Sequence, residues 1–464
     1  MDNKEVGDNL PARGPVARPF GRMGERARAR RTAVDPVLIS EEDRGLRFAR
    51  LMTVGHGREM LCAPATLGKN GFRERSETRL RPRPLNSMES ILKGVRVLEL
   101  GQVLAAPFAG AILADLGAEV VKVERSDGGD DARHMGEPFR AGDSLCFHVF
   151  NRGKKSVSLD LKTELGMASF HKLVAGTDIL IHNLRPDVVR TLRLEGRELC
   201  ERYPRLIFCE ISAFGSVGAM SMQPGYEPLL QAFSGLSSIN GGPTDPPMRT
   251  GASICDQGSG MWVVIGALAM LQRRHLTGRG GQVSTSLLET AMVWAAQKSD
   301  ALVNEGKAPE RHRSGHPGFV PYEEFDTQDA PLLICCGNDR LFAKLAQELE
   351  RPDWISDARY STNRARLQNK LDLIPDIALL LREQPRSHWL NRFTRVGIPC
   401  AQVQTIAEAI AHPQVQALGL IQQVPGQDFQ LTGLPLTIDG ERPSVRSAAP
   451  KLGEHNDEVL SSPE

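Results

Sequence analysis

Residues 95–124 read VRVLELGQVLAAPFAGAILADLGAEVVKVE, and this stretch decides the fold. Both ends are short runs rich in branched apolar residues, which are typical of buried strands. The segment between them carries apolar residues at three- and four-residue spacing, as an amphipathic helix does. A strand, a helix and a second strand in this order predict a parallel βαβ unit.

The same alternation continues toward the C-terminus, so we predict an α/β protein with a doubly wound parallel sheet. In such sheets ligands bind beyond the carboxyl ends of the strands. The further predicted strands are 156–161, 178–183 and 206–212. The predicted helices are 106–117, 164–175 and 187–202. A nearly all-round apolar segment, 258–273, predicts a buried helix.

The 464 residues divide by composition into four parts. Residues 1–87 hold 18 basic and 11 acidic residues with little periodicity, which predicts a disordered basic extension. A start-site extension, a targeting segment and a functional segment all remain open, although transit peptides are poor in acidic residues. We expect a large domain over 88–292, a linker over 293–312 and a small α+β domain over 313–411. Residues from about 412 to 464 should complete the large domain.

Composition and missing motifs exclude several classes of function. The net charge of +1 gives no signature of a nucleic-acid partner, and the longest apolar run, 261–271, is too short to span a bilayer. With no signal peptide at the start of the sequence either, we expect a cytoplasmic protein. Eight cysteines without metal-site spacing predict reduced thiols and no metal centre. Neither GxGxxG nor GxxxxGK[ST] occurs at a strand end, which disfavours nicotinamide or nucleoside triphosphate chemistry.

Nine motifs follow one another over about residues 92–420. They are LKGVRVLEL at 92–100, APFAG at 106–110, LGAEVVKVER at 116–125, NRGKKSVSLDLK at 151–162, NLRP at 183–186, ISAFG at 211–215, TGRGGQ at 277–282, VPY at 320–322 and GNDR at 337–340. This ordered set closely resembles the CaiB/BaiF family of class III CoA-transferases. The resemblance implies a Rossmann-like large domain, a small α+β domain and a homodimer of two interlocked subunits.

The resemblance also implies an activity, the transfer of CoA from an acyl-CoA donor to a carboxylic acid acceptor. Coenzyme A then enters as part of the substrate, and no permanently bound cofactor is expected. A racemase or isomerase acting on 2-methylacyl-CoA is the alternative within the family. A non-catalytic module that binds CoA or nucleic acid is the alternative outside it.

Asp256 stands in GASICDQGSG at 251–260, directly before the predicted apolar helix. The residues alone favour a helix N-cap, because an aspartate there satisfies free backbone N–H groups. The resemblance instead implies the nucleophile, which forms a mixed aspartyl anhydride and then an aspartyl-CoA thioester. A carboxylate with an ordinary pKa of about 4 is ionised at neutral pH and needs no general base for this attack.

CoA carries a diphosphate and a 3′-phosphate, so basic residues after strands are candidates to meet it. Read alone, each such residue is more often a solvated loop charge, and we interpret Lys154 and Lys155 as solvated or rim charges. Thr191 stands where the family usually has arginine, with Arg190 beside it. The resemblance implies CoA contacts by Leu104, Ala105, Arg125, Leu159, Lys162, Asn183, Leu184 and Arg185.

Tyr226 and Glu227 occupy the place where racemases of the family have a histidine. Racemisation needs two groups that exchange a proton at moderate pH, and a tyrosine with a pKa near 10 is a poor member of such a pair. We therefore favour the transferase. Glu227 is expected either to position the substrate or to join a structural ion pair.

Overall fold

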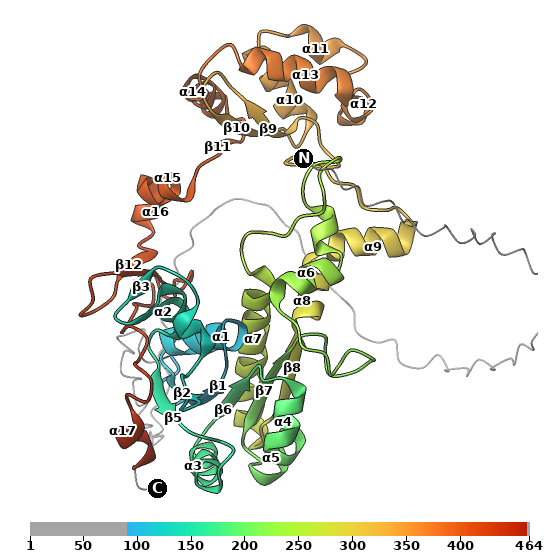
Figure 1. Cartoon of the computed structure of the whole chain (residues 1–464). Helices are drawn as coiled ribbons and strands as arrows, with labels where there is room; N and C mark the ends of the chain where they lie inside the picture. Colours follow the sequence, from blue (N-terminus) through green and yellow to red (C-terminus); the bar gives the residue numbers. More distant parts are fainter. Residues whose placement is uncertain (1–90, 462–464) are drawn as a thin grey trace, which may run out of the picture. The chain divides into compact units, whose positions relative to one another are not determined.

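The structure is a computed structural model that describes residues 91–461. The predicted extension, residues 1–87, lies outside the described residues. Figure 1 shows the arrangement of helices and strands in the described part. Two hydrophobic cores dominate it, one around a six-stranded sheet and one around a three-stranded sheet.

The large sheet has the order β5-β2-β1-β6-β7-β8, and every neighbouring pair is parallel. If only the six strands of this sheet are numbered along the chain, their order is 3-2-1-4-5-6, which is the Rossmann arrangement. The prediction of a parallel α/β sheet is therefore confirmed. The switch point lies between β1 and β6. The strands are β1 (Arg96–Leu100), β2 (Glu119–Glu124), β5 (Lys155–Ser158), β6 (Ile179–His182), β7 (Ile207–Ser212) and β8 (Gly281–Ser286).

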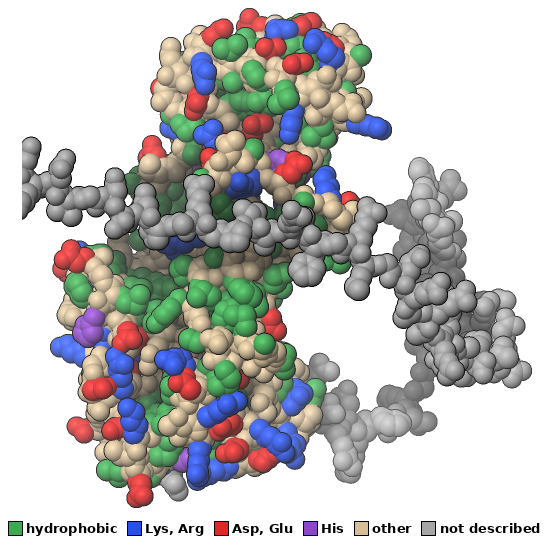
Figure 2. Space-filling model, turned by 45° about the vertical axis from the view of Figure 1, so that its right-hand side comes forward, with side chains coloured by type: hydrophobic (Ala, Val, Ile, Leu, Met, Phe, Trp, Pro, Cys, Tyr) green, Lys and Arg blue, Asp and Glu red, His purple; other side chains and the backbone are tan. Residues whose placement is uncertain are grey.

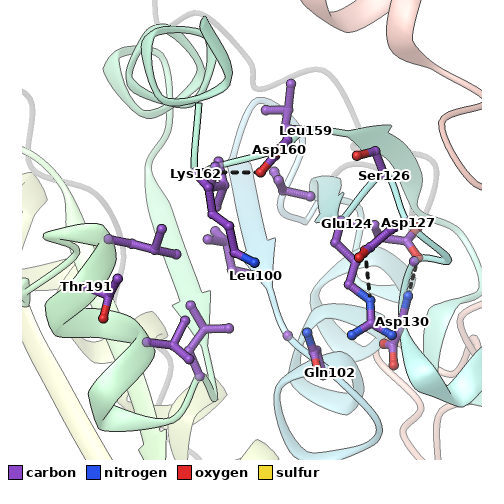
Figure 3. Close-up of a pocket in the computed structure, with 18 of the residues that line it drawn as sticks. Leu100, Gln102, Glu124, Ser126, Asp127, Asp130, Leu159, Asp160, Lys162 and Thr191 are labelled. Atoms are coloured by element: carbon purple, nitrogen blue, oxygen red, sulfur yellow. Dashed lines mark hydrogen bonds and ion pairs between the residues drawn. The ribbon is translucent and has the colours of Figure 1, made fainter. Parts of the chain in front are cut away.

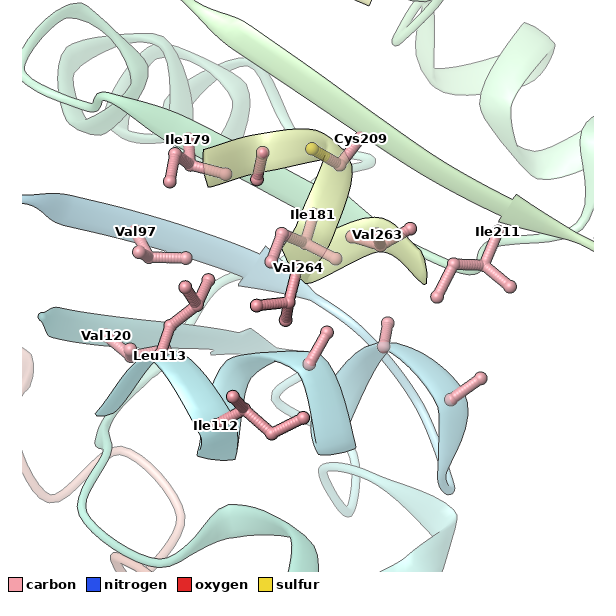
Figure 4. Packing of buried hydrophobic residues seen from close by; sticks show 14 of the residues in the cluster. Val97, Ile112, Leu113, Val120, Ile179, Ile181, Cys209, Ile211, Val263 and Val264 are labelled. Carbon is pink, nitrogen blue, oxygen red and sulfur yellow. The ribbon is translucent and has the colours of Figure 1, made fainter. Parts of the chain in front are cut away.

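Helices cover both faces of this sheet because successive strand side chains point to opposite sides. Val97 packs with α1 (Ala105–Asp115) and α7 (Ile254–Thr277), as Figure 4 shows. Leu98 belongs to the core on the other face. Its helices are α3 (Glu164–Ala175), α4 (Pro186–Leu192) and α5 (Gly196–Arg202).

Two sequence predictions for this domain are wrong in detail. The single helix predicted over 187–202 is two helices, because Arg193 adopts a left-handed conformation with φ 54° between α4 and α5. Strand β8 was not predicted. It is an edge strand whose sequence, GQVSTS, carries few apolar residues.

The prediction that α7 is buried all round is wrong for the single chain. Its inner face holds Val263, Val264 and Ala267, but Trp262 and Ile265 are 37% and 54% exposed. Within the described residues α7 is also the one helix whose length and composition would suffice to cross a membrane. Here it packs against α1, β7 and β8.

The second core belongs to a small α+β unit. Its antiparallel sheet has the order β11-β10-β9. The strands are β9 (Tyr322–Asp326), β10 (Pro331–Cys335) and β11 (Cys400–Gln402). The helices are α10 (Asp339–Glu348), α11 (Asp353–Ser356), α12 (Asn363–Gln368), α13 (Lys370–Leu381) and α14 (Arg386–Val396).

The C-terminal segment lies along the outer edge of β5. The backbone N–H of His455 donates to Ser156 O at 3.0 Å, and Ser158 N donates to the Asn456 side chain at 2.8 Å. The elements not yet named connect or flank the two cores. They are η2 (Asp131–His134), β3 (Phe139–Arg140), β4 (Asp143–Ser144), α2 (Leu145–Asn151), α6 (Glu227–Phe233), η3 (Leu236–Ile239), α8 (Leu287–Trp294), α9 (Ala296–Glu305), α15 (Ile406–Ala411), α16 (Pro413–Ala417), β12 (Ile421–Gln423), β13 (Gln430–Thr432) and α17 (Asn456–Leu460).

Candidate active site

A pocket of about 450 Å³ opens at the carboxyl ends of β1, β2, β5 and β6. Figure 3 shows its walls, with Leu100 at the end of β1 and Glu124 at the end of β2. Leu159 follows β5 on one side, and α4 contributes Thr191 on the other. The pocket therefore lies at the carboxyl-end edge of the sheet, where the parallel-sheet prediction expects a ligand to bind.

Residues 101–104, the 101–104 loop, join β1 to α1 and form part of the pocket wall through Gly101 and Gln102. Asn183, after β6, holds this loop from one side. Its Oδ1 accepts from Gln102 N at 2.8 Å, and its Nδ2 donates to Gln102 O at 2.9 Å. On the other side, Asp130 Oδ1 accepts from Val103 N at 2.9 Å. The loop is thus fixed through its backbone.

A cluster of buried charges lies directly beneath the loop. Lys122 Nζ contacts Glu99 Oε1 at 3.0 Å and Asp130 Oδ2 at 2.8 Å, and it donates to Gly101 O at 2.7 Å. Lys154 Nζ contacts Glu99 Oε2 at 2.6 Å. Removing one partner of such a pair typically costs about 3–5 kcal/mol, because the other charge stays buried and unpaired.

The interpretation of Lys154 as a solvated charge is therefore wrong, whereas Lys155 is half-exposed and pairs with Glu119 and Glu458. The two adjacent lysines point to opposite sides at the start of β5. Burial lowers the pKa of Lys154 to about 8, although Glu99 opposes that shift. The Lys122 pKa is raised, because its carboxylate partners outweigh the effect of burial.

Asp256 lies in the first turn of α7, but it is not the N-cap residue. Ser253 holds that position, so the N-cap interpretation of Asp256 is wrong. Gly260, one helical turn further on, lies on the same face as Asp256. A Cβ atom at Gly260 would come within 2.7 Å of the Ala105 carbonyl oxygen. The face of α7 that carries Asp256 thus packs against the start of α1, directly after the 101–104 loop.

Glu227 provides the side-chain acceptor at the start of α7. Its Oε1 accepts from Cys255 N at 3.3 Å and from Gln231 Nε2 at 2.6 Å. Gln231 is held in turn by Thr250, whose backbone N–H donates to Gln231 Oε1 at 2.9 Å. Glu227 is 4% exposed and pairs with no cation among the described residues. A structural ion pair of Glu227 is thus not formed within residues 91–461 of one chain.

The environment of Asp256 changes its acidity. Burial, reinforced by the nearby Glu227 carboxylate, raises the pKa of Asp256 to about 7. The expectation of an ordinary pKa near 4 is therefore wrong for the free enzyme. A carboxylate of higher pKa is also a more basic nucleophile once it is ionised. Among the described residues no side-chain hydrogen bond or ion pair engages the Asp256 carboxylate, so its oxygens can approach a ligand.

The predicted CoA residues divide into two groups around the pocket. Arg125, Leu159, Lys162 and Leu184 line it, and Figure 3 shows the Lys162 side chain reaching inward. Thr191 also lines it, whereas the adjacent Arg190 does not.

The other predicted contacts lie outside the pocket lining. Leu104 is the N-cap residue of α1, and Ala105, its first residue, is 3% exposed. Asn183 acts on the 101–104 loop through Gln102. Arg185 is exposed and pairs with Asp187 at 2.9 Å.

Two further observations complete the site. Tyr226 precedes α6 and is 75% exposed, so no described residue covers its ring. No group of three or more His, Cys, Asp or Glu side chains is placed to hold a metal ion in residues 91–461.

Sequence reasoning missed the buried cluster around Lys122. A signal was present, because VLEL and VVKV each carry one charge inside an apolar strand run. The two strands are neighbours, and Glu99 lies opposite Lys122 in their register.

Comparison with known proteins gives a consistent result. The family model described as CoA-transferase family III matches residues 92–456. Acetyl-CoA:oxalate CoA-transferase of Acetobacter aceti is 36% identical over 78% of this chain and 92% of its own length. Succinate–glutarate CoA-transferase of Agrobacterium fabrum is 34% identical over 80% of this chain and 95% of its own length.

Solved structures agree with the sequence comparison. A CaiB/BaiF family protein from Brucella suis superimposes with a TM-score of 0.73 at 31% identity. The match covers 80% of this chain and 98% of that protein.

Proposed function

The chain belongs to CoA-transferase family III, and we propose that it moves CoA from an acyl-CoA donor to a carboxylic acid through covalent intermediates on Asp256. The observation that carries this proposal is the 101–104 loop. It forms part of the pocket wall at the end of β1, and it leads into Ala105, which packs against the Asp256 face of α7.

The pocket supplies the binding part of the proposal. Arg125 and Lys162 are the cationic side chains that line it, and we propose that both bind CoA phosphates. The pantetheine arm would then follow the 101–104 loop toward α7. This path brings the thioester to Asp256 and holds it there, and such orientation alone can contribute several kcal/mol to lowering the barrier.

The chemistry begins when the ionised Asp256 attacks the thioester carbonyl. The C–S bond breaks, CoA leaves as a thiolate, and Asp256 is left in a mixed anhydride with the donor acyl group. The thiolate then attacks the Asp256 carbonyl carbon, which releases the donor acid as a carboxylate and leaves an aspartyl-CoA thioester. The acceptor carboxylate reverses both steps, so no water is consumed.

Free backbone N–H groups near Asp256 can stabilise the negative oxygen that develops in each step. At the start of α7, Ala252 O already accepts from Ile254 N, and Glu227 accepts from Cys255 N. This leaves the Asp256 N–H and the first N–H groups of α1 without a partner in their own helices, and the dipole of each helix is positive at that end. Glu227 accepts from Cys255 N, so its negative charge lies beside Asp256. That charge favours the neutral, acylated forms of Asp256 over the ionised one.

The names of the relatives guide the choice of acceptor. They include CoA-transferases named for oxalate, glutarate and L-malate, all short dicarboxylic acids. We propose that this chain also uses a dicarboxylic acceptor. The racemase alternative loses support, because relatives from Acetobacter aceti, Agrobacterium fabrum and Mus musculus, each at least 32% identical to this chain, are named as CoA-transferases.

We further propose that two copies form a homodimer, interlocked as the family resemblance implies. Hydrophobic side chains gather on the surface shown in Figure 2. On α7 and α8, Trp262, Ile265, Val293 and Trp294 are all more than a third exposed. A second copy that covers this face would remove it from water, and apolar patches of this kind mark protein interfaces.

A panel of acyl-CoA donors and dicarboxylic acids, read by mass spectrometry of the CoA products, tests the proposed function. Asp256→Asn is the matched control, because it keeps the size of the side chain and removes the nucleophile. We expect a new acyl-CoA for at least one pair with the wild type and none with the variant. Exchange of the α-proton in deuterated water without transfer would support the racemase instead.

A further inference from the structure

The 101–104 loop has its polar backbone groups fixed before any ligand binds. Lys122 Nζ donates to Gly101 O at 2.7 Å, and Asn183 holds both backbone groups of Gln102. Asp130 Oδ1 accepts from Val103 N at 2.9 Å. These contacts come from β2, from the segment after β2 and from the end of β6, so three separate segments determine the path of one loop.

Val103 shows why so many contacts are needed. Its φ is 63°, in the left-handed region that β-branched residues rarely adopt. The strain of this conformation persists only where the surroundings determine it. If Val103 N lost its acceptor, the residue would relax to a negative φ. Gln102 and the pocket wall that it forms would then move.

Lys122 stabilises this arrangement from outside the pocket. It is fully buried and does not line the cavity, so it cannot touch a ligand there. It contacts Asp130 Oδ2 at 2.8 Å while Oδ1 of the same carboxylate holds Val103. Glu99 lies opposite Lys122 in the sheet, and its carboxylate is the second negative group in contact with the Lys122 ammonium.

We infer that Lys122 is a positioning residue, which acts through Gly101 and Asp130 to keep the 101–104 loop in its CoA-binding shape before the substrate arrives. The expected effect of Lys122 on CoA binding rests on the proposed function. The positioning itself is a property of the free protein and can be measured without any substrate.

The first readout is amide hydrogen exchange of residues 101–104 in the full chain without CoA. Lys122→Met should speed exchange of the Val103 amide about tenfold or more, since its acceptor Asp130 loses the contact with Lys122 and becomes mobile. The second readout is calorimetric titration with free coenzyme A, whose Kd should rise about tenfold. Lys122→Gln, which keeps a donor for Gly101, should move both readouts less and serves if the Met variant does not fold.

Val103→Gly separates positioning from general destabilisation. Glycine adopts a positive φ without strain, so in the Lys122→Met background it should return the CoA Kd to within about threefold of the wild type. Asp115→Asn is the matched control. Asp115 Oδ2 and Arg152 Nη2 form a similarly buried ion pair, 2.6 Å apart, and neither residue contacts the 101–104 loop. This substitution should lower stability and leave loop exchange and the CoA Kd unchanged.

Unchanged loop exchange and CoA affinity in folded Lys122 variants would overturn the inference and leave the proposed function intact. So would a failure of Val103→Gly to restore binding. If the wild type bound no CoA, the proposed function would fail instead, while the exchange measurement would still decide whether Lys122 holds the loop.

Discussion

The Glu227 carboxylate accepts a hydrogen bond from the backbone N–H of Cys255 at 3.3 Å, and Asp256 is the next residue of α7. One contact therefore fixes the start of the helix and brings a second negative charge to the proposed nucleophile. Because the Glu227 charge opposes ionisation of Asp256, it helps to raise the pKa of Asp256 to about 7.

The first prediction concerns the pH dependence of transfer. Only the ionised form of Asp256 attacks, so kcat/KM should rise with pH through about 7 and then level off. Glu227→Gln keeps the acceptor for Cys255 N but removes the charge, so the acidic limb should move to lower pH. The measurement is kcat/KM for the donor between about pH 5 and 9. A limb that stays in place in the variant would show that Glu227 does not tune Asp256.

The second prediction concerns stability. The folded-state pKa of Asp256 lies above its unfolded value of about 4, so the folded protein binds the proton more tightly. Stability is then lost as pH rises from the unfolded value through about 7. Asp256→Asn cannot ionise and should be more stable than the wild type above that pH, by an amount on the order of 4 kcal/mol.

Denaturant unfolding at several pH values measures the difference in unfolding free energy between Asp256→Asn and the wild type. This difference should vanish at about pH 4, give or take about one pH unit. Asp300→Asn, on the exposed surface of α9, is the control and should have little effect at any pH. An Asp256→Asn variant no more stable than the wild type at high pH would contradict the raised pKa.

The third prediction concerns the phosphates of CoA. Lys162→Ala should raise the KM for the acyl-CoA donor about tenfold and change kcat little, because the lost contact is the same in ground and transition states. Arg125→Ala should behave in the same way. Lys172→Ala, an exposed lysine on α3 outside the pocket, is the control. A drop in kcat without a change in KM would place Lys162 in a role other than binding.

The fourth prediction concerns the exposed face of α7. Ile265 is 54% exposed in the single chain, and a homodimer would cover it. Ile265→Asp should therefore shift the protein toward monomers or aggregates in sedimentation velocity experiments. Leu165→Asp, on α3 and 80% exposed, should leave the dimer unchanged. A wild-type monomer at micromolar concentration would refute the proposed dimer.

The parallel sheet was predictable because its inner strands carry a continuous apolar pattern that only burial on both faces explains. The edge strand β8 lacks that pattern, and its place depends on pairing with β7. Likewise, nothing local distinguishes Lys154 from Lys155. The partner that buries Lys154 is Glu99, which lies in a strand distant in sequence.

The role of Asp256 could be predicted only from resemblance. Ser253 and Asp256 are both good capping residues, so local sequence cannot say which of them begins the helix. In the structure the helix begins after Ser253, and the side chain that accepts from an N–H group of its first turn is Glu227 rather than Ser253 or Asp256. Such a contact joins two helices, and no periodicity within either of them encodes it.

Trapping the covalent intermediate tests the central claim most directly. Hydroxylamine added during turnover with a donor acyl-CoA should convert an activated aspartate into its hydroxamate, which peptide mass spectrometry can locate. We predict the modification on Asp256, dependent on the acyl-CoA and absent when the donor is omitted. A modification on another residue, or an Asp256→Asn variant that transfers CoA at nearly the wild-type rate, would contradict the account.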